Sequence, residues 1–196
     1  MPRPKIDVDQ KRREILAVAQ RQIEQYGPHK VTMQDISEAC GMSQSNIYRF
    51  FSSKDALLAS LADQWFDEIE SKLADVVRSQ GTPQDVLELF IRTQFRMKRD
   101  RYDENPALFI SYLTLAAMNP EAIQKHVARL QKWLRALVRN CLPPGKPAQR
   151  MVALVEDMTI KYRDPHLISA HRKECTDVRL DALLRAVHEL LSGELS

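Results

Sequence analysis

Glycine is scarce in this chain of 196 residues, and its few positions argue against one class of protein. The five glycines, Gly27, Gly41, Gly81, Gly145 and Gly193, all fall at apparent breaks between helices. None belongs to a glycine-rich loop of the kind that cradles nucleotide phosphates. No nucleophilic side chain has an identifiable general base beside it. We therefore expect neither an enzyme nor a bound cofactor.

Cysteine and long apolar runs are also scarce. The three cysteines, Cys40, Cys141 and Cys175, are far apart and odd in number, which argues against a disulfide framework. The most apolar stretch, residues 108–118, is too short to span a membrane and includes hydroxyl side chains. The first residues contain no apolar signal core. We expect no membrane association and a cytoplasmic location.

The sequence does contain a dense group of helix start and stop signals at residues 32–58. Thr32 with Asp35, and Ser52 with Asp55, have the spacing of capping boxes. In a capping box a hydroxyl and a carboxylate satisfy backbone N–H groups at the start of a helix. Two helix starts are therefore predicted close together.

A tight turn is predicted between these two starts. Gly41 can adopt the positive φ that ends one short helix, and Ser43 can cap the next. The segment thus predicts a short helix, a tight turn, a second short helix, another turn and a longer helix. This order is that of a helix-turn-helix motif.

The second short helix divides its residues between two faces. Met42, Ile47 and Phe51 can point inward with Ile36 and Ala39 of the preceding helix. Small polar side chains on the first turn of a helix can enter a major groove and bring amide groups against base edges. An ordinary solvated helix face is the alternative interpretation. The outward residues are Gln44, Ser45, Asn46 and Arg49, and Tyr48, Arg49 and Lys54 are placed to contact phosphates.

The same segment carries a longer pattern of residues, without gaps, within residues 11–61. The pattern consists of Thr32, Asp35-Ile36, Ala39, Gly41-Met42-Ser43, Ile47-Tyr48, Phe50-Phe51, Lys54 and Leu57-Leu58. It resembles the DNA-binding region of TetR-family transcriptional regulators. The resemblance implies an all-α protein with a three-helix DNA-binding head at residues 1–56. It also implies a larger helical domain at residues 57–196 that binds a small effector and forms a homodimer.

The resemblance also assigns roles to individual residues. The base-reading surface begins after Ser43, while backbone contacts fall to residues on either side of it. Ser45-Asn46 stand where the family often has glycine-threonine, and Arg49 stands where it often has histidine, so the operator sequence is not transferable. By resemblance the base-reading residues are Gln44, Ser45 and Asn46, and the backbone-contacting residues are Thr32, Tyr48, Arg49 and Lys54. Ser43, which precedes the base-reading surface, is also counted among the residues predicted to bind DNA.

Charge is nearly balanced over the whole chain but not at its start. The 29 basic and 26 acidic residues give a net charge of only +3. Residues 1–13 hold five basic and two acidic residues, so their excess of three equals the net charge of the chain. A basic arm ahead of a DNA-binding head can contact phosphates or the minor groove. A solvated terminus without that role is an equally good interpretation.

The rest of the chain has helical periodicity and no strand pattern. One helix is predicted near residues 9–25 and a long one over residues 58–76. Further apolar faces follow at residues 86–91, 106–118, 123–141, 151–158 and 178–191. By resemblance the last two helices pair with the same two helices of a second subunit. Burial within one subunit is the alternative.

An effector pocket is predicted in the helical body from apolar and aromatic residues that carry a few polar neighbours. The same residues could serve only as core. The candidates are Gln94, Phe95, Met97, Phe109, Tyr112, Met118, Trp133, Met151, Asp157 and Met158.

The sequence as a whole predicts a ligand-responsive transcriptional regulator. We expect a homodimeric repressor that binds a palindromic operator and is released by a small molecule of unknown class. One alternative is a helical protein-interaction module whose head has lost affinity for DNA. Another is a metal-responsive regulator that uses His166, His171 and Cys175, although Asp164-Pro165 interrupts their spacing and no metal site is predicted.

Overall fold

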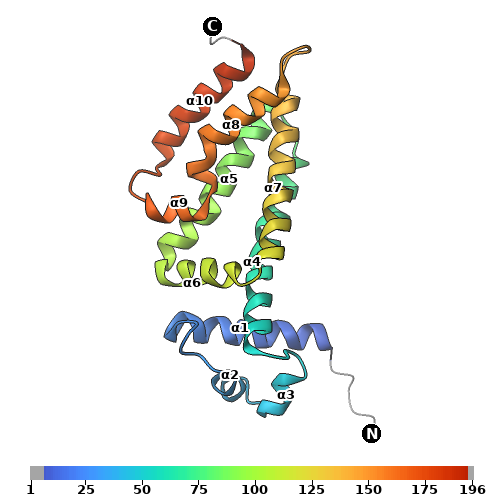
Figure 1. The fold of residues 1–196 in the computed structure, drawn as a ribbon, viewed down its shortest axis with the longest axis vertical. Helices are drawn as coiled ribbons and strands as arrows, with labels where there is room; N and C mark the ends of the chain where they lie inside the picture. Colours follow the sequence, from blue (N-terminus) through green and yellow to red (C-terminus); the bar gives the residue numbers. More distant parts are fainter. Residues whose placement is uncertain (1–6, 194–196) are drawn as a thin grey trace. The chain divides into compact units, whose positions relative to one another are not determined.

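The computed structural model describes residues 7–193, and this range is all-helical, as predicted. It contains ten α-helices and no strand (Figure 1). Arg3 and Lys5 of the predicted basic arm lie outside the described residues. The helices are α1 (Val8–Tyr26), α2 (Met33–Ala39), α3 (Gln44–Tyr48), α4 (Lys54–Val77), α5 (Pro83–Glu104), α6 (Pro106–Ala117), α7 (Pro120–Asn140), α8 (Ala148–Arg163), α9 (Pro165–Ala170) and α10 (Asp177–Ser192).

Contacts divide the chain into two compact units. Unit 1 consists of Met1–Trp65 and Ala107–Pro120, and unit 2 consists of Phe66–Pro106 and Glu121–Ser196. Helix α4 contributes its first half to unit 1 and its second half to unit 2. The predicted domain boundary between residues 56 and 57 falls in the first turn of α4 and stays a prediction.

Unit 1 is built around the first four helices. Helices α2 and α3 lie together on one side of α1 (Figure 1). Ile15, Ile36, Ile47 and Leu57 have no exposed surface, so each of α1 to α4 contributes to one apolar core. The prediction that Ala39 points inward is wrong, because its side chain is exposed near the end of α2. The buried face of α2 consists of Met33, Ile36 and Ser37, and Ala39 lies outside that face.

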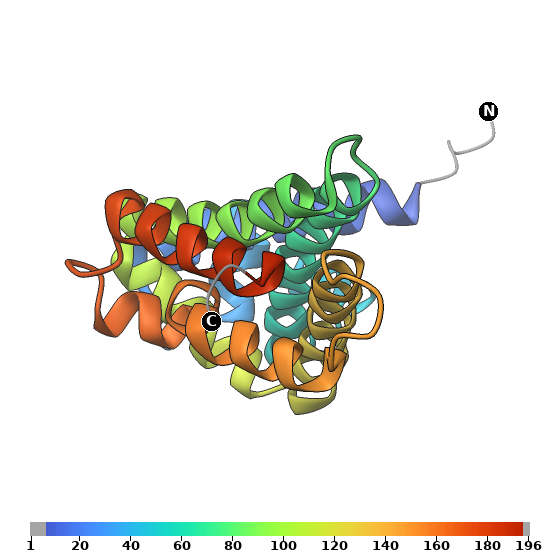
Figure 2. The same cartoon turned by 90° about the horizontal axis from the view of Figure 1, so that it is seen from above.

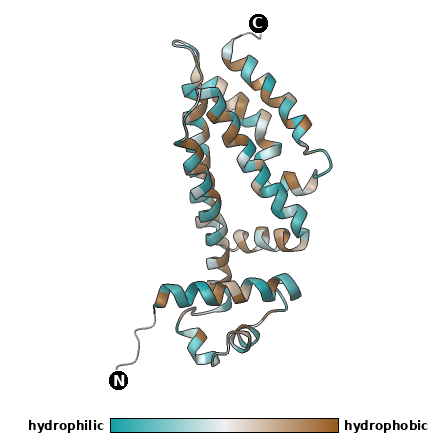
Figure 3. Ribbon diagram, turned by 180° about the vertical axis from the view of Figure 1, so that it is seen from behind, coloured by the Kyte–Doolittle hydropathy of each residue, from teal (hydrophilic) through white to brown (hydrophobic). Residues whose placement is uncertain are grey.

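Helix α6 completes unit 1 although it is distant in sequence. It carries no charged residue and is mostly brown or pale in Figure 3, unlike the largely teal α1. Phe109 and Tyr112 of α6 are buried, and each ring lies 5.7 Å from the ring of Trp65 in α4. Aromatic burial on this scale is a large contribution to a small core.

In unit 2, α5 lies beside α8, α9 and α10 (Figures 1 and 2). The rings of Phe95 in α5 and Tyr162 in α8 meet edge to face at 5.3 Å. The short helix α9 was not expected. It begins with Asp164, whose carboxylate accepts the Leu167 N–H, and with Pro165 in the first helical position. This pair is a helix-start signal rather than an interruption.

Within residues 7–193, no helix is both long enough and apolar enough to cross a membrane.

Candidate nucleic-acid interface

The start of α2 is fixed by the capping box that the sequence predicts. The Asp35 N–H donates to Thr32 Oγ1 at 3.1 Å, and the Thr32 N–H donates to Asp35 Oδ2 at 2.8 Å. The Thr32 hydroxyl and backbone N–H lower the pKa of Asp35, and the nearby Lys54 ammonium lowers it further. Thr32, Asp35 and Lys54 are therefore neighbours, although they come from the ends of two different helices.

A glycine turn joins α2 to α3. Gly41 has φ +62°, a conformation that other residues rarely adopt. The Gly41 N–H donates to the Glu38 carbonyl, and the Met42 N–H donates to the Ser37 carbonyl at 2.9 Å. This pair of bonds is a Schellman motif, which closes the carboxyl end of a helix. The turn thereby fixes the direction in which α3 leaves α2.

Two predicted caps differ in detail from the structure. Ser43 precedes α3, but its hydroxyl forms no capping bond and instead lies 3.1 Å from the hydroxyl of Ser45. The capping box predicted at Ser52 and Asp55 is wrong by one residue. Helix α4 begins at Lys54, and Ser53 Oγ accepts the Ala56 N–H at 3.0 Å.

The polar residues predicted to contact DNA lie on the surface of unit 1. Within the described part of the chain, no hydrogen bond or ion pair occupies the side chains of Gln44, Asn46, Tyr48 or Arg49. Polar side chains without internal partners remain available for an external one. The exposed residues are Thr32, Ser43, Gln44, Ser45, Asn46, Tyr48 and Arg49, whereas Lys54 is half-buried.

Buried side chains on one face hold the short helix α3 against the core of unit 1. Ile47 is fully buried and Phe51, just after α3, is 2% exposed. The Arg12 guanidinium of α1 lies 4.2 Å from the centre of the Phe51 ring and donates to the Phe50 carbonyl. Arg12 was grouped with the basic arm in sequence, but its side chain is half-buried against Phe51 within unit 1. These contacts hold α3 in place while its other face stays exposed.

The local charge also suits a polyanion. Between Glu38 and Asp55 the chain has two basic residues, Arg49 and Lys54, and no acidic one. A phosphate backbone approaching α3 would therefore meet no carboxylate on this segment. The overall charge of +3 hides this local feature because acidic residues are concentrated elsewhere.

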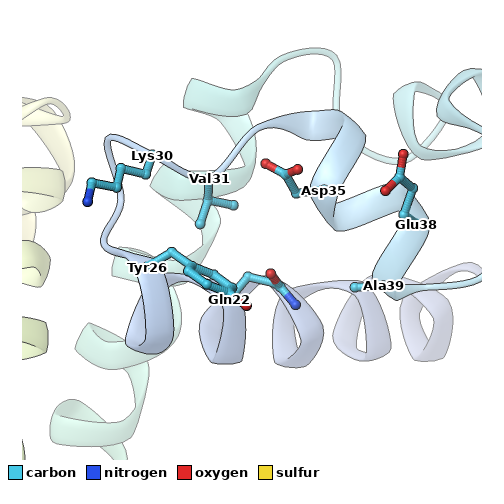
Figure 4. Close-up of a pocket in the computed structure, with 7 residues that line it drawn as sticks. All are labelled: Gln22, Tyr26, Lys30, Val31, Asp35, Glu38 and Ala39. Atoms are coloured by element: carbon cyan, nitrogen blue, oxygen red, sulfur yellow. The ribbon is translucent and has the colours of Figure 1, made fainter.

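A hollow of about 430 Å³ opens between α1 and α2 (Figure 4). It contains none of the residues predicted to contact DNA, so it is separate from the α3 surface. Its lining residues are Gln22, Tyr26, Lys30, Val31, Asp35, Glu38 and Ala39.

The candidate effector residues are divided between the two units. Phe109, Tyr112 and Met118 belong to unit 1, where Met118 is 56% exposed. The others belong to unit 2, where Gln94 and Phe95 are buried and Asp157 is exposed. The half-buried ones are Met97, Trp133, Met151 and Met158. Their role as a pocket stays a prediction.

Sequence reasoning missed the buried basic residues of unit 2. Lys98 is 4% exposed, Arg163 is 9% exposed and His126 is 7% exposed. The signal for Lys98 was present, because it continues the spacing of Ile91, Gln94 and Phe95 along one face of a helix. Periodicity alone does not assign a lysine to an apolar face, because lysine is almost never fully buried unless it is paired.

The described residues contain no group of three or more side chains that could hold a metal ion. His166 lies in α9, His171 ends it, and Cys175 is buried. Burial raises the pKa of the Cys175 thiol, which disfavours the thiolate that a metal requires.

The capped α2, the glycine turn and the anchored, exposed α3 define a helix-turn-helix DNA-binding unit. Residues 15–61 match the bacterial regulatory proteins of the tetR family, and residues 83–184 match the tetracyclin repressor-like C-terminal domain. The second match alone covers more than half of the chain, so the chain belongs to the tetR family. This family consists of transcriptional regulators and not of enzymes.

Curated relatives agree with the family. An uncharacterized HTH-type transcriptional regulator of Mycobacterium tuberculosis is 36% identical over 51% of this chain, which spans about half (48%) of that protein's length. The HTH-type transcriptional regulator RutR of Escherichia coli is 25% identical over 80% of this chain and 76% of its own.

Solved structures share the fold. A TetR transcription regulator from Haloarcula marismortui has a TM-score of 0.67, with 18% identity over 94% of this chain and 98% of its own. A second structure, AibR in complex with isovaleryl coenzyme A and operator DNA, has a TM-score of 0.52, with 15% identity over 92% and 97%.

Proposed function

We propose that this protein is a ligand-responsive repressor that binds a palindromic operator in the cytoplasm as a homodimer. In this proposal Gln44, Ser45 and Asn46 read base edges in the major groove. The residues that contact the DNA backbone are Thr32, Tyr48, Arg49 and Lys54. A small effector bound in the helical body shifts the population of dimers away from the DNA-binding arrangement.

The proposal rests on the exposure of the polar side chains on α3 and at its end. Its amide and guanidinium groups are exposed and have no internal partner, while Ile47 and Phe51 fix the helix from below. An Asn or Gln amide can pair with both polar atoms on the major-groove edge of adenine, and Arg can pair with guanine or a phosphate. A merely solvated helix has no need of such an arrangement.

Exposed apolar residues on the last helices support a homodimer. Ile160 of α8 is 44% exposed and Val178 of α10 is 78% exposed. Helices α8 and α10 lie side by side (Figures 1 and 2), so a second copy could cover both at once. A two-fold dimer would place its two α3 helices on half-sites about one DNA turn apart.

The interface is tested by charge insertion. Ile160→Glu should shift the sedimentation coefficient toward the monomer at micromolar concentration, because a carboxylate in an apolar interface loses its hydration. Leu89→Glu is a matched control, since Leu89 in α5 is also 44% exposed. Equal behaviour of the two variants would argue against this interface.

DNA binding is tested by fluorescence anisotropy. The purified protein is titrated onto the intergenic DNA upstream of its own gene and onto a scrambled duplex, at two salt concentrations. We expect binding to the intergenic DNA to persist at the higher salt while binding to the scrambled duplex is lost. Equal binding to both duplexes that disappears in salt would contradict operator recognition at that site.

A single substitution then separates regulation from a protein-interaction role. Lys54→Ala should weaken binding to every duplex and reduce the salt slope by about two, because the homodimer loses one phosphate contact in each half-site. An interaction module without operator binding would show no change.

A further inference from the structure

The buried face of α5 contains two polar residues that its packing does not explain. This face also carries Phe90, Ile91 and Phe95, each with no exposed surface. Gln94 and Lys98 lie among them, 1% and 4% exposed, and are four residues apart on the same side of the helix. Two adjacent polar positions in such a core are expensive unless they are satisfied.

Gln94 is not satisfied. Its side-chain Nε2 is buried and has no hydrogen-bond partner in the part of the chain that the structure describes. An unpaired buried donor costs about 1–3 kcal/mol, so native proteins seldom keep one without a reason. A leucine at this position would fill similar space without that cost. The amide therefore calls for an acceptor from outside the chain.

Lys98 adds positive charge beside this donor. Its ammonium donates to the main-chain carbonyl of Arg163, and no carboxylate forms an ion pair with it within residues 7–193. The Arg163 guanidinium donates to Thr159 Oγ1 at 2.8 Å and to the Glu156 carbonyl at 2.9 Å, again without a carboxylate partner. Two cations are thus buried between α5 and α8 without a carboxylate at ion-pair distance, although the charges of Glu156 and Asp164 act on Arg163.

The pKa of Lys98 reflects this lack of compensation. Burial, followed by the neighbouring Arg163 charge, lowers the pKa of Lys98 to about 8, and Asp164 offsets only part of the effect. Burial also lowers the pKa of His126, against the opposing effect of the Glu70 carboxylate 2.8 Å from its Nδ1, and the Lys98 charge lowers it further. A negative charge brought to this place would be stabilised.

A purely structural role accounts for part of the arrangement. The Lys98 ammonium satisfies a carbonyl in the last turn of α8, where a cation also interacts well with the helix dipole. That role explains why a lysine is tolerated. It does not explain the free amide of Gln94 one turn away, nor the absence of a paired carboxylate.

We propose that Gln94 and Lys98 form the head-group site of the effector, and that the effector is a small monocarboxylate with an apolar body. This inference rests on the proposed ligand control. One ammonium and one amide N–H match the two oxygens of a single carboxylate. The apolar neighbours Phe90, Ile91 and Phe95 suit a hydrocarbon body and not a second charged group.

The class of ligand is tested with a matched panel and no DNA. The probes are hexanoate, phenylacetate, hexanamide, hexylamine and hexyl phosphate, each titrated to millimolar concentration while the melting temperature is followed. We expect the two carboxylates to raise it by roughly 2 °C or more and the amide and amine to leave it unchanged. Equal shifts with hexanamide, a larger shift with hexyl phosphate, or no shift with either carboxylate would overturn the proposal.

Gln94→Leu is the decisive variant because it removes an unpaired donor and should fold at least as well as the parent. We expect its half-maximal carboxylate concentration to rise at least tenfold. Gln131→Leu, at a half-buried glutamine of α7, is the matched control and should keep the parental response. An unchanged response in Gln94→Leu would exclude a ligand role for this amide.

A separate readout distinguishes failure of this inference from failure of the proposed function. Anisotropy with the intergenic duplex is repeated with and without saturating hexanoate. Carboxylate binding without any change in DNA affinity would keep the head-group site but contradict ligand control through it. Specific DNA binding combined with no carboxylate-dependent melting shift would overturn the site and leave the regulator intact.

Discussion

The surface of α3 and the buried face of α5 place similar side chains in opposite environments. Gln44 on α3 and Arg49 just after it are exposed, and their side chains have no partner within the described residues, while buried Ile47 and Phe51 support the helix. On α5, Gln94 and Lys98 are buried among apolar side chains. An exposed polar group hydrogen-bonds to water, so it costs little free energy and can bind various partners. A buried polar group is selective, because only a partner that completes its hydrogen bonds offsets the free energy of its desolvation.

The largest expected effect is on the free energy of unfolding, when a buried residue that supports α3 is replaced. Phe51→Ala should lower the free energy of unfolding by about 3–5 kcal/mol, because it leaves a cavity and removes the ring under Arg12. Tyr48→Ala, at a 45% exposed ring, should leave the unfolding midpoint nearly unchanged while weakening DNA binding. Urea denaturation measures the first quantity and anisotropy the second. Similar destabilisation by both would show that α3 is not divided into a support and a free surface.

The next-largest expected effect is on the discrimination between DNA sequences. Asn46→Ala should cost about 1–3 kcal/mol of discrimination between the operator and a duplex changed at one base pair, because a bidentate amide contact is lost. Competition titrations with single-site operator variants measure this discrimination. An unchanged preference at every position would remove the base-reading role from Asn46.

The pH dependence of stability tests the buried face of α5. The folded pKa of Lys98 is about 8, below its usual 10.5, so the unfolded chain binds more protons between these values. Stability should therefore rise with pH through this window, by about 1 kcal/mol from pH 7.5 to pH 9 for this group. Lys98→Met should remove that part of the rise. Arg163 and Asp164 remain in both proteins, and His126, whose pKa is lowered from 6.5, titrates below this window, so subtraction of the two curves isolates Lys98 between pH 7.5 and pH 9.

The smallest effects separate two serines that look alike in sequence. Ser53→Ala should cost roughly 1 kcal/mol of stability, because its hydroxyl accepts the Ala56 N–H at the start of α4. Ser43→Ala should cost only a few tenths, because the Ser43 hydroxyl forms no capping bond. Equal losses in urea denaturation would mean that Ser43 caps α3 in solution.

The sequence was sufficient for the parts governed by local rules. Thr32 with Asp35 and the positive φ of Gly41 are decided by residues within a few positions of one another, and both were predicted. The error at Ser52 came from two adjacent serines, either of which can cap a helix. Helix α9 was missed because Asp164-Pro165 was interpreted as a break instead of a start.

The remaining features depend on distant contacts that no local rule encodes. The Arg12 guanidinium meets Phe51 only because α1 packs against the end of α3, so its basic character suggested a solvated arm. Burial of Lys98 likewise depends on the end of α8, which lies 65 positions further along the chain. The effector residues and the dimer surface remain predictions for the same reason.

The packing of α6 limits how the DNA-binding unit can be transplanted. Phe109 and Tyr112 cover Trp65, so the first unit is made from two pieces of chain separated by more than forty residues. A chimera that ends its donor segment within α4 would graft the reading surface but leave an indole without its aromatic neighbours. A chimera made by exchanging DNA-binding heads, in the laboratory or by recombination, would stay stable only under one of two conditions. Either α6 is transferred together with the head, or the acceptor protein provides an equivalent pair of aromatic residues.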